Sequence, residues 1–325
     1  MSTVKVDNEI FVMRVLHLLE MSIKEIIQLV PRIAEAGFTH IQIGNVCPLK
    51  SKMYPNELNK KYGYPYKRNR YSDWWKLYQP LRFEIGNEEI GSKEDLIELC
   101  KVADKYNIKI VIDFVPRHLA SSERRYEDMV PNKNCDPEIL AREDSFLYRI
   151  PMKYGDRFSE IWHCNKLPSL NYTSEFIISK YTSFLKEIVD CGVKGIRIDM
   201  AKHIALPSEG GKLFWEMIKY FKEEYKLDIY GESIQCGDDI LNKILDETNI
   251  MVLTDYIGYN RSDRTVKFIY SHDIALTEKM DIENEKVIEG YCKICENNPN
   301  TLFYTMDYKD WDDPRVVKAN EADPS

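Results

Sequence analysis

The sequence predicts an α/β fold, a closed (β/α)8 or TIM barrel with one irregular excursion after its third strand. Three observations predict it. Eight strand-like segments follow one another along the chain, and helix-like segments separate most of them. A barrel of this kind needs roughly 250 residues, so a chain of 325 residues has room for one barrel and a long insertion. Charged residues also stand where several strands end, which is where such barrels place their chemistry.

The first two strands and the helix between them have clear local signals. The segment Ile10–Leu16 is apolar apart from Arg14 and reads as a strand. Residues Ile23–Ala36 carry apolar side chains at helical spacing, and Gly37 follows at the position where helices commonly end. His40–Ile43 then supplies the second strand. A strand, a helix and a strand in this order form one repeat of the expected barrel.

The third strand comes after a long loop of about residues 46–91. Ser92 suits the N-cap of a helix, with Asp95 three residues later as in a capping box, so we expect a helix to begin there. The segment Ile108–Val115 is almost wholly apolar and β-branched, which is typical of a strand covered on both faces. An irregular stretch follows it.

The second half of the chain repeats the strand and helix patterns. We expect helices near residues 174–190, 211–225, 238–247 and 285–296. We expect strands at Gly195–Ile198, Leu227–Tyr230, Met251–Thr254, Phe268–Ser271 and Thr301–Tyr304. About a dozen residues separate the sixth strand from the seventh, too few for a full crossover helix. We assign residues 1–118 and 173–325 to the barrel and residues 119–172 to a small domain inserted after the third strand.

Composition argues against several classes of function. The chain has 45 basic and 53 acidic residues, a formal net charge of −8, whereas nucleic-acid-binding proteins normally carry a basic face. No apolar run approaches the roughly 18–20 residues of a membrane span. The N-terminal apolar stretch contains Arg14 and His17 and has no small-residue cleavage site, so we interpret it as a strand rather than a signal peptide. Eight cysteines scattered singly favour a reducing, cytoplasmic location.

Charged side chains stand at the carboxyl ends of four predicted strands, the third, fourth, fifth and seventh. They are Asp113, Arg197, Asp199, Glu232, His272 and Asp273. The carboxyl ends of parallel barrel strands meet at one rim, so we expect these groups to converge. Carboxylates gathered in this way suit nucleophilic and acid–base catalysis. Arg197 lies two positions before Asp199, on the same strand face, and its charge favours the ionised carboxylate that a nucleophile needs.

Several segments resemble the signatures of the α-amylase family of glycosidases (glycoside hydrolase family 13), in the family's order along the chain. The similarity begins at Gly37–Ile43 and extends to about residue 275. Its segments are Trp74-Trp75-Lys-Leu-Tyr78-Gln79-Pro80, similar to W-W-x-x-Y-Q-P; Asp113-Phe-Val-Pro-Arg-His118, similar to D-V-V-x-N-H; Leu167-Pro-Ser-Leu-Asn171, similar to L-P-D-L-N; Gly195-Ile-Arg197-Ile-Asp199-Met-Ala-Lys202-His203, similar to G-x-R-x-D-x-x-K-H; Gly231-Glu232; and Ser271-His272-Asp273.

The resemblance implies Asp199 as nucleophile, Glu232 as general acid and base, and Asp273 as a third carboxylate that holds the substrate. It also implies substrate-binding roles for Trp75, Tyr78, Gln79, His118, Arg197, Lys202, His203 and His272, and a supporting role for Asp113. Retaining cleavage of a glycosidic bond needs a nucleophile and an acid with carboxyl groups roughly 5–5.5 Å apart. Aromatic side chains offer apolar faces to a sugar, while its hydroxyls take hydrogen bonds from His and Gln.

Two departures from the family pattern concern metal binding. Many family members bind a structural calcium between the barrel and the excursion, with ligands that include the Asn of the first signature and the Asp of L-P-D-L-N. Those positions hold Arg117 and Ser169 in this chain. Calcium requires several oxygen ligands, and a guanidinium puts positive charge in its place. We therefore expect no cofactor and no calcium at this place, and we expect Arg117 to replace the ion by pairing with an acid of the excursion.

The resemblance predicts a retaining hydrolase of α-1,4-linked glucans of the starch and glycogen type, with no nucleic-acid or membrane partner. It leaves the oligomeric state open. Two alternatives stay open: a transglycosylase, in which a sugar rather than water resolves the glycosyl-enzyme, and an inactive barrel that only binds glucan. The segment from Glu232 to Asp273 is shorter than expected for the family. We also expect the family's C-terminal β-sandwich to be absent.

Overall fold

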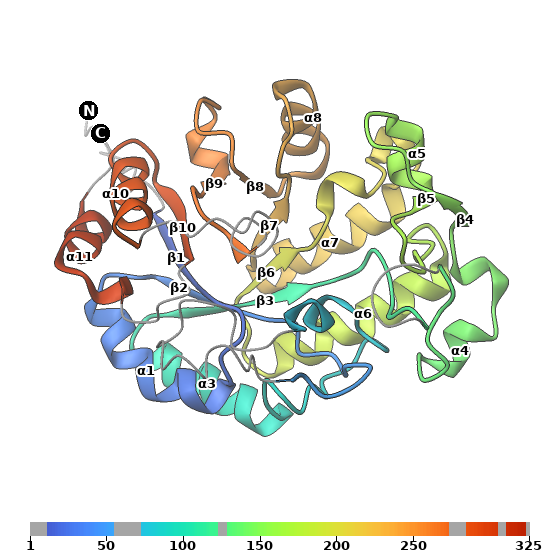
Figure 1. Cartoon of the computed structure of the whole chain (residues 1–325), viewed down its shortest axis with the longest axis horizontal. Coiled ribbons are helices and arrows are strands. Elements are labelled where there is room, and N and C mark those ends of the chain that lie inside the picture. The colour runs from blue at the N-terminus through green and yellow to red at the C-terminus, as the bar shows by residue number, and fades with distance from the viewer. Residues whose placement is uncertain (1–11, 55–72, 123–128, 273–283, 305–309, 323–325) are drawn as a thin grey trace, which may run out of the picture.

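The barrel expected from the sequence is present (Figure 1). A computed structural model of the chain describes residues 12–54, 73–122, 129–272, 284–304 and 310–322. Eight parallel strands close in the order β1-β10-β9-β8-β7-β6-β3-β2. They are β1 Met13–Leu18, β2 His40–Ile43, β3 Lys109–Phe114, β6 Gly195–Ile198, β7 Asp228–Glu232, β8 Met251–Thr254, β9 Thr265–Lys267 and β10 Asn300–Tyr304.

Helices follow most of the strands and surround the barrel in Figure 1. They are α1 Ile23–Glu35, α3 Lys93–Lys105, α6 Glu175–Asp190, α7 Lys212–Tyr225, α8 Asp238–Thr248, α10 Asn284–Cys295 and α11 Pro314–Glu321. Each of the six predicted helices is found within two residues of its expected bounds. The sequence did not predict α11, which begins at the N-cap Asp313.

Capping side chains set the boundaries of the first two helices. Ser22 begins α1 and forms a capping box with Glu25. Ser92 begins α3 in the same way with Asp95, as predicted. Gly37 follows α1 with a φ of +80°, and a Cβ at this position would lie 2.8 Å from the Cβ of Asn320. The predicted helix stop is therefore also a place where α11 packs so closely that a side chain would not fit.

The seventh barrel strand differs from its prediction. β9 comprises Thr265–Lys267, and the predicted segment Phe268–Ser271 comes after it. The apolar segment Phe268–Ser271 has the composition of a buried strand, and Lys267 does not. Lys267 can nevertheless lie in a buried strand, because its Nζ donates to the carbonyl oxygens of Ile257 and Tyr259, at 2.8 and 2.6 Å. The link from β8 to β9 contains only the 3-10 helix η5, Ser262–Arg264, as its short length predicted.

The first strand is also displaced, since β1 ends at Leu18 rather than Leu16. Its pairing with β2 continues to the partners Leu18 and Ile43, so the hydrogen-bonded ladder and not the apolar run decides where it ends. Residues 10 and 11 of the predicted strand Ile10–Leu16 lie outside the described residues.

The segment between β3 and α6 forms a separate lobe beside the barrel (Figure 1). It contains α4 Pro137–Leu140, β4 Tyr148–Pro151, α5 Arg157–Trp162 and β5 His163–Cys164, and β4 pairs with β5 in a two-stranded sheet. The antiparallel bridge from His118 to Ser169 joins the start and the end of this segment. The lobe therefore leaves and rejoins the barrel at one place, near the carboxyl end of β3.

Candidate active site

A cleft of about 390 Å³ opens at the carboxyl ends of the barrel strands. Small-molecule sites commonly have volumes of roughly 300–1,000 Å³. The lining comes from the 3-10 helix η1 (Trp74–Tyr78), from the lobe, and from the ends of strands. The lining residues are Trp74, Trp75, Tyr78, Gln79, His118, Pro151, Met152, Tyr154, Cys164, Asn165, Lys166, Leu167, Asp199, Met200, Glu232 and His272.

Most of the residues singled out in the sequence meet at this cleft. Seven of them line it: Trp75, Tyr78, Gln79, His118, Asp199, Glu232 and His272. Two more, Arg197 and Asp113, are fully buried and contact the lining carboxylates or aromatic rings directly. Lys202 and His203 lie in the next segment after Met200 and are not part of the lining. Asp273 lies outside the described residues.

Arg197 joins three carboxylates at the bottom of the cleft. Its Nη1 lies 2.7 Å from Oδ1 of Asp199 and 3.2 Å from Oδ1 of Asp113, and its Nη2 lies 3.0 Å from Oε1 of Glu232. Burial opposes the charge of this guanidinium, but Asp113 and Glu232 outweigh it and raise the pKa of Arg197 well above its ordinary value. Arg197 is therefore a fixed cation that holds two cleft carboxylates close together.

Glu232 has a second donor that the sequence did not reveal. The backbone N–H of Met200 donates to Oε2 of Glu232 at 2.7 Å. Met200 has a φ of +51°, in the left-handed region that a long side chain rarely adopts. Strained backbone of this kind occurs at functional sites, where the surrounding structure holds it in place. Here the unusual turn directly after Asp199 aims an N–H at the neighbouring carboxylate.

Asp113 is buried and receives donors from three sides. Tyr78 Oη donates to its Oδ2 at 2.8 Å, Gln42 Nε2 donates to its Oδ1 at 3.2 Å, and Arg197 completes the set. Gln42 in turn accepts from Tyr230 Oη at 2.7 Å. Burial raises the pKa of Asp113, and the charge of Arg197 works in the opposite direction. This chain of contacts ties the floor of the cleft to β2, β3 and β7.

Aromatic rings form one wall of the cleft. The rings of Tyr78 and His272 stack with centroids 5.2 Å apart and an interplanar angle of 3°. Trp74 meets both rings edge-on, at 6.1 and 5.6 Å. Below them His17, on β1, contacts His272 at 5.4 Å. A flat apolar wall opposite carboxylates suits a ligand with apolar faces and polar edges.

The other lining residues on this side are also held by their neighbours. His118 Nε2 lies 2.7 Å from the carbonyl oxygen of Tyr78, which makes this nitrogen the donor. Lys50 Nζ donates to Oε1 of Gln79 at 2.8 Å and lies 4.9 Å from the centre of the Trp75 ring. The wall therefore has little freedom to rearrange around a ligand.

Burial keeps the histidines of the site neutral near pH 7. Burial is the main cause that lowers the pKa of His118 to about 4, that of His272 to about 4 and that of His203 to about 3. Neutral imidazoles both donate and accept hydrogen bonds, as recognition of hydroxyl groups requires.

Lys202 and His203 support the edge of the cleft instead of lining it. Lys202 Nζ donates to the carbonyl oxygen of Ile234, just after β7, at 2.5 Å. His203 is buried and its ring lies 6.2 Å from that of Tyr154, which does line the cleft. Sequence reasoning missed Tyr154, because a single aromatic residue in an irregular segment carries no pattern. Met200 was equally hidden, since its contribution is a backbone N–H.

A buried guanidinium occupies the place where the family resemblance puts calcium. Arg117 is fully buried there, and its Nη2 donates to three carbonyl oxygens of the lobe, those of Glu160, Ile161 and His163, at 3.2, 3.2 and 2.8 Å. The predicted pairing of Arg117 with an acid is wrong among the described residues, because its Nη2 donates to backbone oxygens instead, while its buried Nε and Nη1 have no hydrogen-bond partner there. Ser169 Oγ donates to the carbonyl oxygen of Leu167 at 3.3 Å.

The described residues contain neither a metal-binding cluster nor a membrane-spanning helix. No cluster of three or more His, Cys, Asp or Glu side chains there could hold a metal ion. No helix in the same parts of the chain has the length and apolar character needed to cross a bilayer.

Comparisons with known proteins point to one family. Residues 78–213 match the sequence profile described as "Alpha amylase, catalytic domain". An α-amylase of Clostridium acetobutylicum is 33% identical over 237 residues, which cover 68% of this chain and 28% of that protein. An α-amylase of Butyrivibrio fibrisolvens is 24% identical and covers 90% of this chain and 34% of its own length. The chain thus spans about a third of the length of these relatives.

Solved structures agree on the fold. An α-amylase from Malbranchea cinnamomea superimposes with a TM-score of 0.67 at 14% identity, covering 95% of this chain and 76% of that one. A γ-CGTase from alkalophilic Bacillus clarkii gives a TM-score of 0.66 at 19% identity, covering 87% of this chain and 44% of that one. At such identities the similarity concerns the barrel architecture.

Proposed function

The chain belongs to the α-amylase family, and from that premise we propose that it is a retaining hydrolase of α-1,4-glucosidic bonds in starch- or glycogen-type oligosaccharides. One observation carries the proposal. A single buried guanidinium, that of Arg197, contacts both Asp199 and Glu232 at the floor of the cleft. Two carboxyl groups held by one guanidinium suit the close spacing of about 5–5.5 Å that retaining glycosidases use.

The first step of the proposed reaction breaks the glycosidic bond. Asp199 attacks the anomeric carbon, and a covalent bond forms between its carboxylate oxygen and that carbon. The bond from the anomeric carbon to the leaving oxygen breaks, and Glu232 gives this oxygen a proton. Arg197 contacts Oε1 of Glu232 and the Met200 N–H donates to its Oε2, and together they fix the orientation of the carboxyl group. The transition state resembles an oxocarbenium ion, which the nearby carboxylates stabilise.

The second step returns the enzyme to its starting state. Glu232, now ionised, takes a proton from water, and the water oxygen bonds to the anomeric carbon while the bond to Asp199 breaks. Arg197 lowers the energy of ionised Asp199 as a leaving group. The ring of Tyr78, fixed by its hydrogen bond to Asp113, offers an apolar face to the sugar. His118 and His272 supply neutral imidazoles beside it. Asp273 is proposed to hold hydroxyl groups.

Maltooligosaccharide turnover tests the proposal. We expect reducing ends to accumulate while chain lengths fall. Redistribution of chain lengths without new reducing ends would contradict hydrolysis and indicate transfer. Saturable binding without any turnover would contradict both and indicate a glucan-binding barrel. Because Asp199 and Glu232 both contact Arg197, the variants Asp199→Asn and Glu232→Gln serve as inactive controls that keep the shape of the site.

We also propose that the protein works in the reducing cytoplasm. All eight cysteines are free thiols in the structure, and burial raises the pKa of several, including Cys100 to about 12. Thiols of this kind are neutral and unreactive, as in many intracellular proteins. Fractionation of the source cells, followed by immunodetection of the protein, tests the location. Recovery in the medium or in an extracellular fraction would contradict it.

A further inference from the structure

We propose that two arginines, Arg117 and Arg157, latch the lobe onto the barrel and position the loop after β6 beside the cleft without a divalent cation. The two side chains lie at opposite ends of the short helix α5, which belongs to the lobe. One reaches from the barrel to the helix, and the other reaches from the helix to the barrel. The kinetic part of the proposal rests on the proposed function.

The first half of the latch is Arg117, which follows β3. Its Nη2 donates to the carbonyl oxygens of Glu160, Ile161 and His163, at the carboxyl end of α5. The last carbonyl groups of a helix have no partner within it and carry partial negative charge, so a cation there is favourable. The guanidinium also lies over the ring of Tyr172, 5.5 Å from its centre. Dipoles and a ring, rather than a carboxylate, therefore compensate this buried charge.

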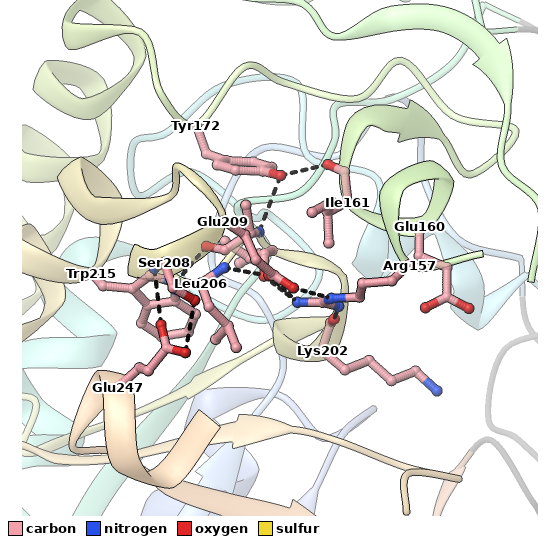
Figure 2. Close-up of polar contacts among 12 residues, drawn as sticks. Arg157, Glu160, Ile161, Tyr172, Lys202, Leu206, Ser208, Glu209, Trp215 and Glu247 are labelled. Atoms are coloured by element: carbon pink, nitrogen blue, oxygen red, sulfur yellow. Dashed lines mark hydrogen bonds and ion pairs between the residues drawn. The ribbon is translucent and has the colours of Figure 1, made fainter. Parts of the chain in front are cut away.

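The second half is Arg157, the first residue of α5 (Figure 2). It forms a bidentate pair with Glu209, with Nε 2.8 Å from Oε1 and Nη2 2.6 Å from Oε2. The same guanidinium donates to the carbonyl oxygens of Lys202, through Nη1, and of Ile204, through Nη2 at 3.4 Å. Bidentate, partly buried pairs of this form are the strong members of their class. The side chain of Arg157, which belongs to the lobe, thus forms hydrogen bonds to both ends of the loop of residues 202–209.

The loop gripped by Arg157 is held from its other sides as well (Figure 2). Tyr172 Oη donates to the carbonyl oxygen of Ile161 in α5 and accepts from the Ala205 N–H at 3.1 Å. Trp215 Nε1, from α7, donates to the carbonyl oxygen of Ala205 at 2.8 Å. The backbone N–H and the hydroxyl of Ser208 both donate to Glu247 of α8, at 2.9 and 2.8 Å. Lobe and barrel helices therefore share this loop.

The latch acts on the cleft because the gripped loop begins beside the catalytic carboxylates. Met200, which donates its N–H to Glu232, lies two residues before Lys202. Lys202 links the loop to Ile234 after β7, and His203 packs next to Tyr154 of the lobe. A shift of the loop would move the donor to Glu232 and the Tyr154 wall together. Arg157 is thus a positioning residue, not a catalytic one.

The donor chemistry explains why this place has no need of a divalent ion. The carbonyl oxygens of Glu160, Ile161 and His163, a type of oxygen ligand that calcium accepts, already receive hydrogen bonds from Arg117. That guanidinium has no carboxylate partner among the described residues, so an added cation would be repelled by a like charge that no neighbouring anion neutralises. A bidentate Arg157–Glu209 pair supplies the bridge to the loop after β6 instead.

The variants Arg157→Ala and Arg157→Lys test the positioning role. Arg142→Ala is the matched control, because Arg142 is an exposed lobe arginine whose one acidic partner in the described parts of the chain is Asp144, and it lies over the Phe176 ring. We expect Arg157→Ala to raise KM for maltooligosaccharides about 10-fold while kcat changes about 3-fold or less. Arg157→Lys should recover part of the loss, and amide exchange over residues 200–209 should rise in the alanine variant. KM and exchange equal to those of Arg142→Ala would overturn the proposal.

Thermal unfolding with excess EDTA or with added calcium tests the cation-free latch without any substrate. We expect equal melting temperatures in both solutions. A fall of several degrees with EDTA, or a rise with calcium, would overturn the proposal. If the chain fails to cleave glucan, the exchange and melting measurements still decide the latch, so the two proposals fail separately.

Discussion

Arg197 in the barrel and Arg117 at the lobe are both buried cations, and different kinds of neighbouring group stabilise their charges. Three carboxylates surround Arg197, whereas three carbonyl oxygens receive Arg117. The carboxylates raise the pKa of Arg197, while burial lowers that of Arg117. The carboxylates around Arg197 are charged groups that can also act as nucleophile or as acid and base. The backbone carbonyl groups around Arg117 fix the position of the lobe but cannot act as nucleophile, acid or base.

The guanidinium of Arg197 therefore serves the proposed catalysis, whereas that of Arg117 serves to hold the lobe against the barrel. Removing Arg197 would leave like charges facing one another at the cleft. Removing Arg117 would leave unsatisfied dipoles at the end of a helix. The two regions should therefore respond differently to substitution and to pH.

The largest expected effect is on the carboxylates that Arg197 holds. Asp199→Asn and Glu232→Gln should each lower kcat for maltooligosaccharide hydrolysis by about 10⁴-fold or more, because each variant removes an obligatory bond-making or proton-transfer group. Reducing-end assays measure the rates, and circular dichroism verifies the fold. Retention of a tenth of the wild-type rate by either variant would refute its assigned role.

Arg197→Lys should lower kcat by about 10²–10³-fold, because one ammonium cannot span the carboxylates that the guanidinium spans. Arg14→Lys is the matched control. Arg14 is equally buried in the barrel, but its Nη1 donates to the carbonyl oxygen of Asn298 at 2.8 Å, away from the cleft lining. The control should lose stability and keep its kcat. Equal kcat losses in the two variants would show that Arg197 acts only through the fold.

A comparison of Arg197→Met with Arg117→Met should separate the two regions by pH. We expect Arg197→Met to lose about 3–5 kcal/mol of unfolding free energy near pH 7, because buried carboxylates lose their cation. This loss should shrink toward pH 5, since those carboxylates then bind protons in the folded state. Arg117→Met should lose about 1–3 kcal/mol at every pH, because carbonyl groups do not titrate. Urea unfolding at several pH values measures both, and parallel pH curves would contradict the distinction.

The smallest expected effect concerns the buried histidines. The unfolded chain binds protons at these imidazoles near pH 6.5, whereas folded His118 and His272 bind them only near pH 4. The unfolded state therefore takes up more protons between these values, and stability should fall as the pH drops from 6.5 to 4. His203→Gln should make the fall shallower, because it removes one titrating group. Denaturant unfolding that gives the same slope for this variant would speak against the assignment.

The same comparison shows how far the sequence alone could lead. Arg197 lies in β6 and Asp199 directly follows this strand, two residues later, so their contact follows from local geometry and was predictable. Arg157 and Glu209 lie 52 positions apart in two different short helices, and no periodicity connects them. The partners of Arg117 are backbone oxygens, which every residue possesses.

Local signals predicted the elements well where apolar spacing and caps agree, as at Ser92 and Gly37. They were wrong at β9, where buried Lys267 depends on carbonyl groups of a neighbouring loop and the more apolar Phe268–Ser271 follows the strand. The left-handed turn at Met200 was also beyond reach, because its sequence holds no glycine or asparagine to mark it.

Mass spectrometry of the Glu232→Gln variant treated with α-maltosyl fluoride tests the central claim most directly. Fluoride leaves without needing a proton, so the first step can proceed, whereas hydrolysis of the covalent intermediate lacks its base. We predict one added maltosyl group, located on the peptide that contains Asp199. A label on another residue, or no label while the wild-type protein consumes the fluoride, would contradict the proposed roles of both carboxylates.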